Sequence, residues 1–471
     1  MDATPMNPFE ITEIRRRLSL FLSPTDAIAC AQVCKSWSDD FLSAIWHTIE
    51  KSSLYQLVKL DLRIIAKHGH RIRVINGLSV EDGVLDKLQD ASVSKIKSLS
   101  MVMKKTIRHL AHCYDLIHRN VTSLTSLNLS MPPPVDREMY FTADCLSPFA
   151  HTGATSSLAY LKIQGLCMTR NTFSRMLNIC QALEHIDIRD TYLQSTVFTD
   201  KYQHPRVTHL TASVEQVFYA DPDKYEPSIL FHFPNLTHWE TWKSRSSFEI
   251  EFNHCIMEIT QYSPHITALC NRTGIGSEEF PLSKVLVYGL RDLTEICVEP
   301  EQLSPEVIMS LMTHKNSLTT VRTSSSYDHL PPSNTAIEFE DYLAKFGWAV
   351  QFIPSHCLRL QEFSLPSHEM DMDDVDKFPW MCHDLQVLHV RIKNLNTMDK
   401  VNTALQMWVD GKRAKLGNNF SKDTEQVTKD LNLASVGYPK QQDSIEIRVA
   451  RHLLRFEKLC TVRLGSKVWH A

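Results

Sequence analysis

Two groups of side chains in the sequence have the residue types that bind metals. His109, His112 and Cys113 fall within one turn of a predicted helix, where imidazole and thiol groups could reach a zinc ion. An acidic run at 369–376 resembles half of a calcium loop, but it lacks the glycine and the terminal glutamate that such a loop needs. No second cluster accompanies the first, so we predict a partly buried helix, a solvated acidic turn, and neither a metal nor another cofactor.

Sequence motifs of catalysis are missing. The sequence has no nucleophile elbow, no phosphate loop and no His-Glu-x-x-His helix. Gly274 and Gly276 lack the third glycine of a dinucleotide-binding fingerprint, so we interpret them as a turn. The twelve cysteines include no Cys-x-x-Cys pair and predict reduced, mostly buried thiols. We expect no catalytic residues; the alternative, an enzyme on an unrecognised fold, needs a clustered His, Cys and Asp pocket.

The composition also excludes some classes of function. Of 471 residues, 43% are hydrophobic and 22% charged, with a formal net charge of -4. A general nucleic-acid binder would carry an excess of Lys and Arg. No stretch approaches the roughly 20 apolar residues that cross a bilayer, and the N-terminus lacks the order of a secretory signal. We therefore expect no nucleic acid, no membrane and a cytoplasmic or nuclear location.

The first fifty residues predict three short helices. Ile11, Ile14, Leu18 and Leu22 recur at offsets of three and four, which is the stripe of an amphipathic helix with the arginines at 15–17 largely on its wet side. Because such a unit has a small core, we expect a partner that helps to cover it.

A second and a third helix come next along the chain. Ser23 precedes Pro24 and, three residues on, Asp26, which is an N-cap signature. Trp37 and Phe41 then begin a run spaced by four residues that predicts the third helix, ending near residue 46.

These residues resemble the F-box. The resemblance runs in order through Pro8-Phe9-Glu10-Ile11, Leu22-Ser23-Pro24-Thr25-Asp26 and Val33-Cys34-Lys35-Ser36-Trp37, and it ends at Trp46. It departs at Asn7 and Ala27, where the family commonly has leucine. The resemblance implies that the helices pack on a Skp-type adaptor, which is held by a cullin scaffold that carries a RING subunit.

The residues that the resemblance places in or directly behind the adaptor interface are Pro8, Ile11, Ile14, Leu18, Leu22, Val33 and Trp37. The alternative interpretation is a small helical cap whose apolar stripe closes the first repeat.

A short pattern recurs beyond residue 95: an aliphatic residue, two variable positions, an aliphatic residue, one variable position and an aliphatic residue. Each copy predicts a strand. The clearest copies begin at Leu124, Leu158, Leu183, Leu293, Leu385 and Leu459, and degenerate ones at Ile96, Val207, Leu236, Ile266, Leu318 and Leu360. Most begin 24 to 34 residues apart, at or just beyond the roughly 20 to 29 residues of leucine-rich repeats.

Helical patterns lie between these strands, for example around Phe173 and Leu177 or Val307 and Leu311. Stacked strand-helix units make a parallel sheet on the concave side and helices on the convex side. The predicted fold class is therefore α/β, with an F-box domain at 1–50, a capping connection at 51–95 and a solenoid resembling irregular leucine-rich repeats at 96–471. A non-repeating α/β domain is the alternative.

The repeats are expected to be irregular. The asparagine that usually comes after the strand is replaced by Thr191, Glu301 or Lys393, so the turns must satisfy their backbone groups differently. Polar insertions are predicted near 131–157, 323–335 and 411–444.

Residues that alternate with the buried aliphatics share the concave face and are candidates for binding a protein client. They are Tyr160, Lys162, His185, Asp187, Arg189, His209, His238, Glu240, Trp242, Glu295, Arg322, His389 and Arg391. Together with the F-box resemblance, they predict a substrate-recognition subunit of an SCF-type ubiquitin ligase. The alternative is a leucine-rich-repeat scaffold that is independent of ubiquitin ligases.

Overall fold

The fold was analysed in a computed structural model. It describes residues 11–79, 83–103, 107–131, 141–142, 149, 156–194, 202–218, 228–242, 252–272, 281–324, 347–395, 397–415, 443–465 and 467–470. The chain divides into two compact units: Met1–Ala212 with Ala220–Glu226, and Ser213–Tyr219 with Pro227–Ala471. Pro8, the Gly274–Gly276 turn and most of the three predicted insertions lie outside the described residues.

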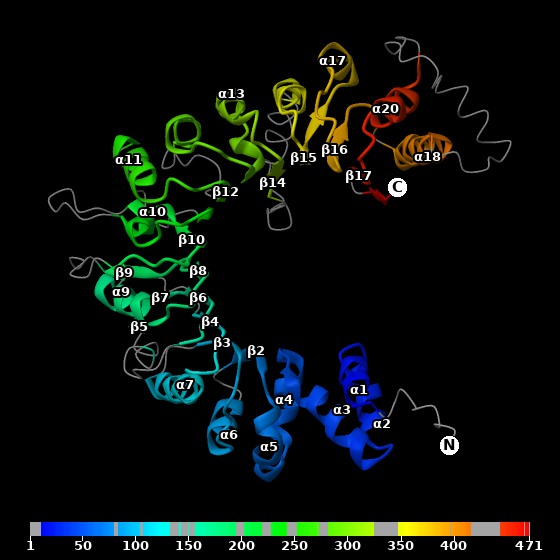
Figure 1. The fold of residues 1–471 in the computed structure, drawn as a ribbon. Helices are drawn as coiled ribbons and strands as arrows, with labels where there is room; N and C mark the ends of the chain where they lie inside the picture. Colours follow the sequence, from blue (N-terminus) through cyan, green and yellow to red (C-terminus); the bar gives the residue numbers. More distant parts are fainter. Residues whose placement is uncertain are drawn as a thin grey trace, which may run out of the picture. The chain divides into compact units, whose positions relative to one another are not determined.

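The first unit begins with three helices, α1 (Thr12–Ser19), α2 (Pro24–Ala31) and α3 (Lys35–His47) (Figure 1). Both α1 and α2 pack against α3. The backbone N–H of Asp26 donates to the Ser23 hydroxyl at 3.2 Å, which caps α2 as its sequence predicts. Phe41 and Trp46 on α3 are buried. The prediction of three N-terminal helices is confirmed.

Parallel strands alternate with helices through the rest of the first unit, in the sheet order β1-β2-β3-β4-β6-β8-β10. The elements are β1 (Thr48–Ile49), α4 (Lys51–Lys59), α5 (Leu62–His68), η2 (Gly69–Arg71), β2 (Val74–Ser79), α6 (Val84–Asp90), β3 (Ser98–Val102), α7 (Ile107–Asn120), β4 (Ser126–Ser130), β6 (Tyr160–Gln164), α9 (Arg170–Ile179), β8 (His185–Asp187) and β10 (His209–Ser213).

A second, small parallel sheet in this unit was not predicted. It joins β5 (Phe141–Thr142), β7 (Leu166–Thr169) and β9 (Tyr192–Gln194). Gly165 makes the step from β6 to β7 with a φ of 75°, and a Cβ there would lie 2.3 Å from the carbonyl oxygen of Met131. Only glycine tolerates both the backbone conformation and the close approach.

The second unit repeats the plan. Its sheet runs in chain order from β11 to β18; every pair up to β17 is parallel, and β18 is antiparallel to β17. The elements are α10 (Val214–Phe218), η6 (Ile229–His232), β11 (His238–Trp242), α11 (Phe252–Tyr262), β12 (Ala268–Arg272), α12 (Leu282–Lys284), η7 (Val285–Gly289), β13 (Glu295–Val298), η8 (Pro300–Gln302), α13 (Pro305–Leu311), η9 (Met312–His314), β14 (Thr320–Thr323), α15 (Gly347–Val350), α16 (Phe352–His356), β15 (Glu362–Met370), α17 (Met372–Lys377), β16 (Val387–Ile392), α18 (Met398–Lys415), α20 (Ile445–Leu453), β17 (Thr461–Leu464) and β18 (Lys467–His470).

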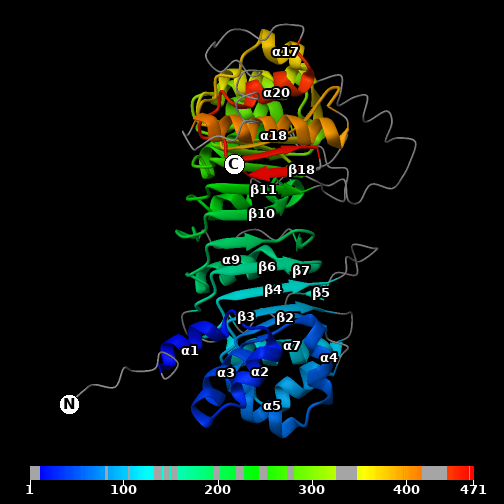
Figure 2. The same cartoon turned by 90° about the vertical axis from the view of Figure 1, so that its right-hand side faces the viewer.

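All twelve predicted strands are confirmed, and each begins two residues after the first aliphatic residue of its copy. That first aliphatic residue is buried in every copy, as Leu124 and Leu459 show. In each unit, helices cover one face of the sheet (Figure 1), and Figure 2 shows β2, β3, β4 and β6 of the first unit side by side in chain order. This is an α/β fold with the connectivity of a solenoid, as predicted. We call the sheet face that the helices leave uncovered the open face.

Buried polar side chains bond to backbone groups of the repeats, and only Thr191 among them stands where the usual asparagine is missing. Asn120 accepts from the N–H of Ile96 at 2.8 Å and donates to the carbonyl of Leu116 at 2.8 Å. His204 and His314 contact carbonyls of the preceding repeat at 3.1 and 2.7 Å, and Thr191 donates to the carbonyl of Ile163 at 2.8 Å. These bonds satisfy backbone groups that would otherwise be buried without a partner.

Across the described residues, no helix combines the length and the apolar character needed to span a membrane.

Candidate functional site

Apolar side chains gather on the surface of the N-terminal helices. Six of the large hydrophobic residues that the structure leaves exposed lie within this short stretch: Ile11, Leu18, Leu20, Phe21, Ile28 and Val33. Phe21 is 84% exposed and Leu20 is 75% exposed. Exposed apolar groups at this density mark interaction surfaces more often than chance decoration. We call these six side chains the apolar surface.

The residues predicted to bind an adaptor fall in two layers here. Ile11, Leu18 and Val33 belong to the apolar surface, whereas Ile14, Leu22 and Trp37 are half-buried behind it. Leu20 and Phe21 were missed, because they come after Ser19, the last residue of α1, and the predicted stripe continued from Leu18 to Leu22 instead. The signal that could have found them is the apolar density of the run from Leu18 to Leu22.

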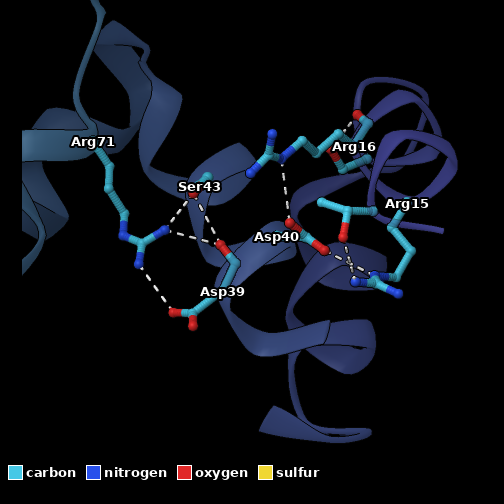
Figure 3. Close-up of polar contacts among 8 residues, drawn as sticks. Arg15, Arg16, Asp39, Asp40, Ser43 and Arg71 are labelled. Carbon is cyan, nitrogen blue, oxygen red and sulfur yellow. Dashed lines mark hydrogen bonds and ion pairs between the residues drawn. The ribbon is translucent and has the colours of Figure 1, made fainter. Parts of the chain in front are cut away.

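The opposite side of α1 is polar and buried, which corrects one prediction. Arg15 was expected on the wet side, but it is 4% exposed, and Ser19, one turn later, is also buried. The Arg15 Nε lies 2.8 Å from the Asp40 carboxylate on α3 (Figure 3). The expectation failed because Asp40, the partner that makes burial of the guanidinium tolerable, lies far along the sequence. Arg16 and Arg17 are exposed as predicted.

Asp40 holds two arginines of α1. Arg16 Nε reaches its other oxygen at 3.3 Å, from a side chain that is 68% exposed. The Arg15 guanidinium also donates to the Thr12 hydroxyl at 3.1 Å. A buried charge with an ion partner and additional hydrogen bonds is the arrangement in which burial is tolerated. Arg15 and Ser19 are therefore buried, whereas Leu18 on the same helix stays exposed.

A second polar group ties α3 to the element after α5. Arg71 on η2 donates to the carbonyl of Asp39 at 2.9 Å, lies 3.1 Å from its carboxylate and also donates to the Ser43 hydroxyl (Figure 3). Nearby, the rings of Trp46 and His68 stack with centroids 5.1 Å apart. Burial, followed by neighbouring cations, lowers the pKa of His68 and favours the neutral ring. These contacts fix α3, against which α1 and α2 pack, to the helices that follow it.

The predicted client residues of the first unit form one patch on the open face. The ring of His185 stacks on His209 with centroids 4.0 Å apart and lies 6.2 Å from the ring of Tyr160. Asp187 is buried, departing from the half-exposed positions around it. Its carboxylate lies 2.6 Å from Arg189 and 3.6 Å from a Lys162 side chain that is also on this face.

The predicted residues of the second unit occupy successive strands on its open face. Glu240 and Trp242 lie on β11, Glu295 on β13, and Arg322 on β14, with none of the four buried. Arg322 forms two bonds of 2.6 Å with Glu362 on β15, and that carboxylate is the first cause that raises the pKa of Arg322.

His238 opens β11, whereas His389 and Arg391 lie on β16. The His389 Nε2 lies 3.3 Å from the carbonyl of Gly465. Burial, followed by the charge of Arg463, lowers the pKa of His389.

Several residues on this face were missed, among them Cys270 and Arg272 on β12, Cys297 on β13 and Glu362 on β15. The alternation that selected the other candidates, applied to the copy beginning at Ile266, gives Cys270 and Arg272 directly. Arg272 Nε lies 3.0 Å from the Glu240 carboxylate, and its guanidinium lies over the ring of Trp242 at 5.4 Å from the centroid. Glu240 and Trp242 are therefore linked through a residue that was not among the predicted candidates.

Residues of both groups of possible metal ligands, at 109–113 and 369–376, form contacts with other side chains. His112 Nδ1 lies 2.6 Å from Asp86, and burial raises the pKa of Cys113 to about 12; the side chain of His109 lies outside the described residues. In the acidic run, Asp376 lies 2.6 Å from Arg448. No group of three or more metal-binding side chains occurs in the part of the chain that the structure describes.

Comparison with known proteins does not assign the chain to a family. No family model matches the chain, and no curated protein matches its sequence. Its function has to be inferred from its own residues.

Proposed function

We propose that this protein is the substrate-recognition subunit of an SCF-type E3 ubiquitin ligase. In this proposal the helices α1 to α3 are an F-box that docks on a Skp-type adaptor, and through it on a cullin scaffold and a RING subunit. The open face of the repeats holds a protein client for ubiquitination and degradation. The protein would work in the cytoplasm or nucleus, where such ligases act.

The observation that carries the proposal is the inverted burial of α1. An amphipathic helix on a self-contained domain turns its apolar stripe inward, yet α1 buries Arg15 and Ser19 while Leu18 remains exposed. Burying apolar surface contributes about 25 cal/mol per Å², so a side chain such as Phe21, at 84% exposure, gains from a partner that covers it. A partner that supplies an apolar helical surface is the chemistry expected of a Skp-type adaptor.

The order of residues along the chain supports the same partner. The capped turn at Ser23 and Asp26 and the N-terminal part of α3 at Trp37 stand where the F-box resemblance requires them. The buried Arg15–Asp40 ion pair joins α1 to α3 and so fixes the orientation of α1.

The client side rests on the chemistry of the open face. Paired charges such as Arg322 with Glu362 and aromatic side chains such as Tyr160 and Trp242 lie there. Aromatic and arginine side chains dominate the affinity of protein interfaces, whereas a net charge of -4 does not favour nucleic acid. The protein would contribute proximity and no reacting group.

Copurification with a Skp-type adaptor tests the proposal. The full-length wild type is expected to bind, and Leu18→Asp and Phe21→Asp are each expected to weaken binding at least about 30-fold, the effect of losing a hot spot of ~2 kcal/mol. The matched control is Met309→Asp, which charges an apolar side chain of similar exposure on α13, 61% exposed, and should leave binding unchanged.

Two outcomes would contradict the proposal: no binding by the wild type, or equal binding by all four proteins. Either result would favour the alternative of a repeat scaffold that acts without a ubiquitin ligase.

A further inference from the structure

Two cysteines face each other on neighbouring strands of the second unit. Cys270 on β12 and Cys297 on β13 are direct partners in the parallel register. Both are half-buried on the open face, and each thiol shifts the pKa of the other. Neighbouring strands lie about 4.8 Å apart, within the roughly 4.4–6.8 Å between Cα atoms that a disulfide spans. The backbone therefore already holds the two residues at a separation that permits a bond.

The surroundings of the pair make its two sulfurs unequal. Arg272 Nε donates to the Sγ of Cys270 at 3.4 Å. The neighbouring Cys297 thiol lowers the pKa of Cys270, burial opposes that effect, Arg272 lowers the pKa further and the Glu240 carboxylate raises it. The Cys270 thiol, together with burial, raises the pKa of Cys297. Since the thiolate is the reactive form and Arg272 donates to the sulfur of Cys270, we assign Cys270 as the nucleophile of the pair and Cys297 as the resolving thiol.

Arg272 is itself held in place. Its Nε lies 3.0 Å from the Glu240 carboxylate, and its guanidinium rests over the Trp242 ring. A cation fixed beside a half-exposed sulfur is the microenvironment of a reactive cysteine. Cys113, Cys180 and Cys357 provide the contrast, because burial raises the pKa of each to about 12.

We propose that Cys270 and Cys297 are a reversible thiol-disulfide site that reacts with low-molecular-weight disulfides such as oxidised glutathione. The Cys270 thiolate attacks one sulfur of oxidised glutathione, so that its S–S bond breaks and one glutathione leaves as a thiolate. Cys297 then gives up its proton and attacks the Cys270 sulfur, which releases the second glutathione. Two protein thiols and one oxidised glutathione become one protein disulfide and two reduced glutathiones.

The disulfide should reverse readily, because it would lie half-buried on the open face, and disulfides that reduced glutathione can reach are the more easily reduced ones. It also removes the thiolate beside Arg272, in the row that runs Glu240, Cys270, Cys297 and Arg322 across four strands. If this face binds the client, as the proposed function holds, oxidation would alter client binding.

Mass spectrometry of the full-length protein tests the site. The reduced protein is equilibrated with defined ratios of oxidised to reduced glutathione, its free thiols are alkylated, and its peptides are analysed. The wild type is expected to yield a peptide pair linked through Cys270 and Cys297 that dithiothreitol separates. Cys460 is the matched control thiol, because it is exposed; it should take up glutathione without forming that linkage.

Single substitutions separate the two steps. Cys297→Ser should trap a mixed disulfide of glutathione on Cys270. In Cys270→Ser, oxidised glutathione should react with Cys297 about tenfold or more slowly than it reacts with Cys270 in Cys297→Ser. Arg272→Met should slow formation of the Cys270–Cys297 disulfide roughly threefold. Both changes reduce the amount of reactive thiolate.

The inference is overturned if Cys460 becomes modified while no Cys270–Cys297 linkage forms at any ratio. It is also overturned if Cys297→Ser accumulates no mixed disulfide at Cys270 under those conditions. Leu18→Asp, which tests the proposed function, should form the disulfide normally, so failure of one proposal is distinguishable from failure of the other.

Discussion

Helix α1 and the repeats bury opposite kinds of side chain. In the repeats, aliphatic residues such as Leu161 and Leu388 are buried, and the positions that alternate with them are polar and partly exposed. In α1, by contrast, Arg15 is buried and Leu18 is exposed. A fold that is stable alone has the first pattern. The second pattern is explained by a partner, and this difference separates residues that hold the fold together from residues that remain available for binding.

The largest expected loss of stability comes from removing the buried ion pair of α1. Arg15→Ala leaves Asp40, with a side chain only 7% exposed, as a buried charge without its main partner. Breaking a buried pair in this way costs about 3–5 kcal/mol. We expect faster hydrogen exchange throughout α1 and α3, measured by mass spectrometry.

Arg16→Ala is the matched control for that change. Arg16 contacts the same carboxylate, but its side chain is 68% exposed, and an exposed ion pair contributes only about 0–1 kcal/mol. Equal loss of protection in the Arg15 and Arg16 variants would show that burial of the pair is unimportant.

A somewhat smaller loss of stability is expected when a buried leucine is shortened, and a much smaller one when an exposed leucine is shortened. Leu161→Ala on β6 removes a fully buried side chain and should lower the free energy of unfolding by about 2–5 kcal/mol. Leu18→Ala, from a leucine that is 37% exposed, should lower it by less than ~1 kcal/mol. Denaturant unfolding of the two variants measures both changes. If Leu18→Ala cost as much as Leu161→Ala, the exposed leucine would be a core residue, and the apolar surface would not be available to a partner.

The same contrast explains what the sequence could predict. The strand pattern directly encodes which aliphatic residues are buried, so every strand from β3 to β17 on the main sheets could be located from spacing alone. The small sheet of β5, β7 and β9 could not, because its strands, of two to four residues, lie outside the copies of the aliphatic pattern.

Side-chain partners distant in the sequence were the other limit. Nothing in the spacing of α1 indicates that Arg15 pairs with Asp40, so the polar side of the helix was assigned to solvent. Of the predicted stripe of Ile11, Ile14, Leu18 and Leu22, only Ile14 and Leu18 lie within α1, because Ile11 is its N-cap and Leu22 follows its end. Which face points inward is decided by the partner residue on α3, and the periodicity of a single helix does not contain that information.

A last effect, spread over several pH units, concerns a second way of burying polar groups. The helices bury a charged pair, whereas the second unit buries neutral histidines: His368 on β15 and His452 on α20. Burial lowers the pKa of His368 to about 4. Burial, with a smaller contribution from Arg455, lowers that of His452 to about 3.

As the pH falls below the ordinary histidine value of about 6.5, the unfolded chain takes up protons that the folded protein does not. Stability should therefore be present above pH ~6.5 and decline toward the folded pKa values, by up to about 1.4 kcal/mol per pH unit for each histidine. Denaturant unfolding of the second unit at a series of pH values measures the slope. His452→Phe keeps an aromatic ring beside Trp380, whose ring centroid lies 4.8 Å from that of His452, and should remove the part of the slope that His452 contributes. An unchanged slope in this variant would show that the acid sensitivity originates elsewhere, since a phenyl ring has no proton to gain.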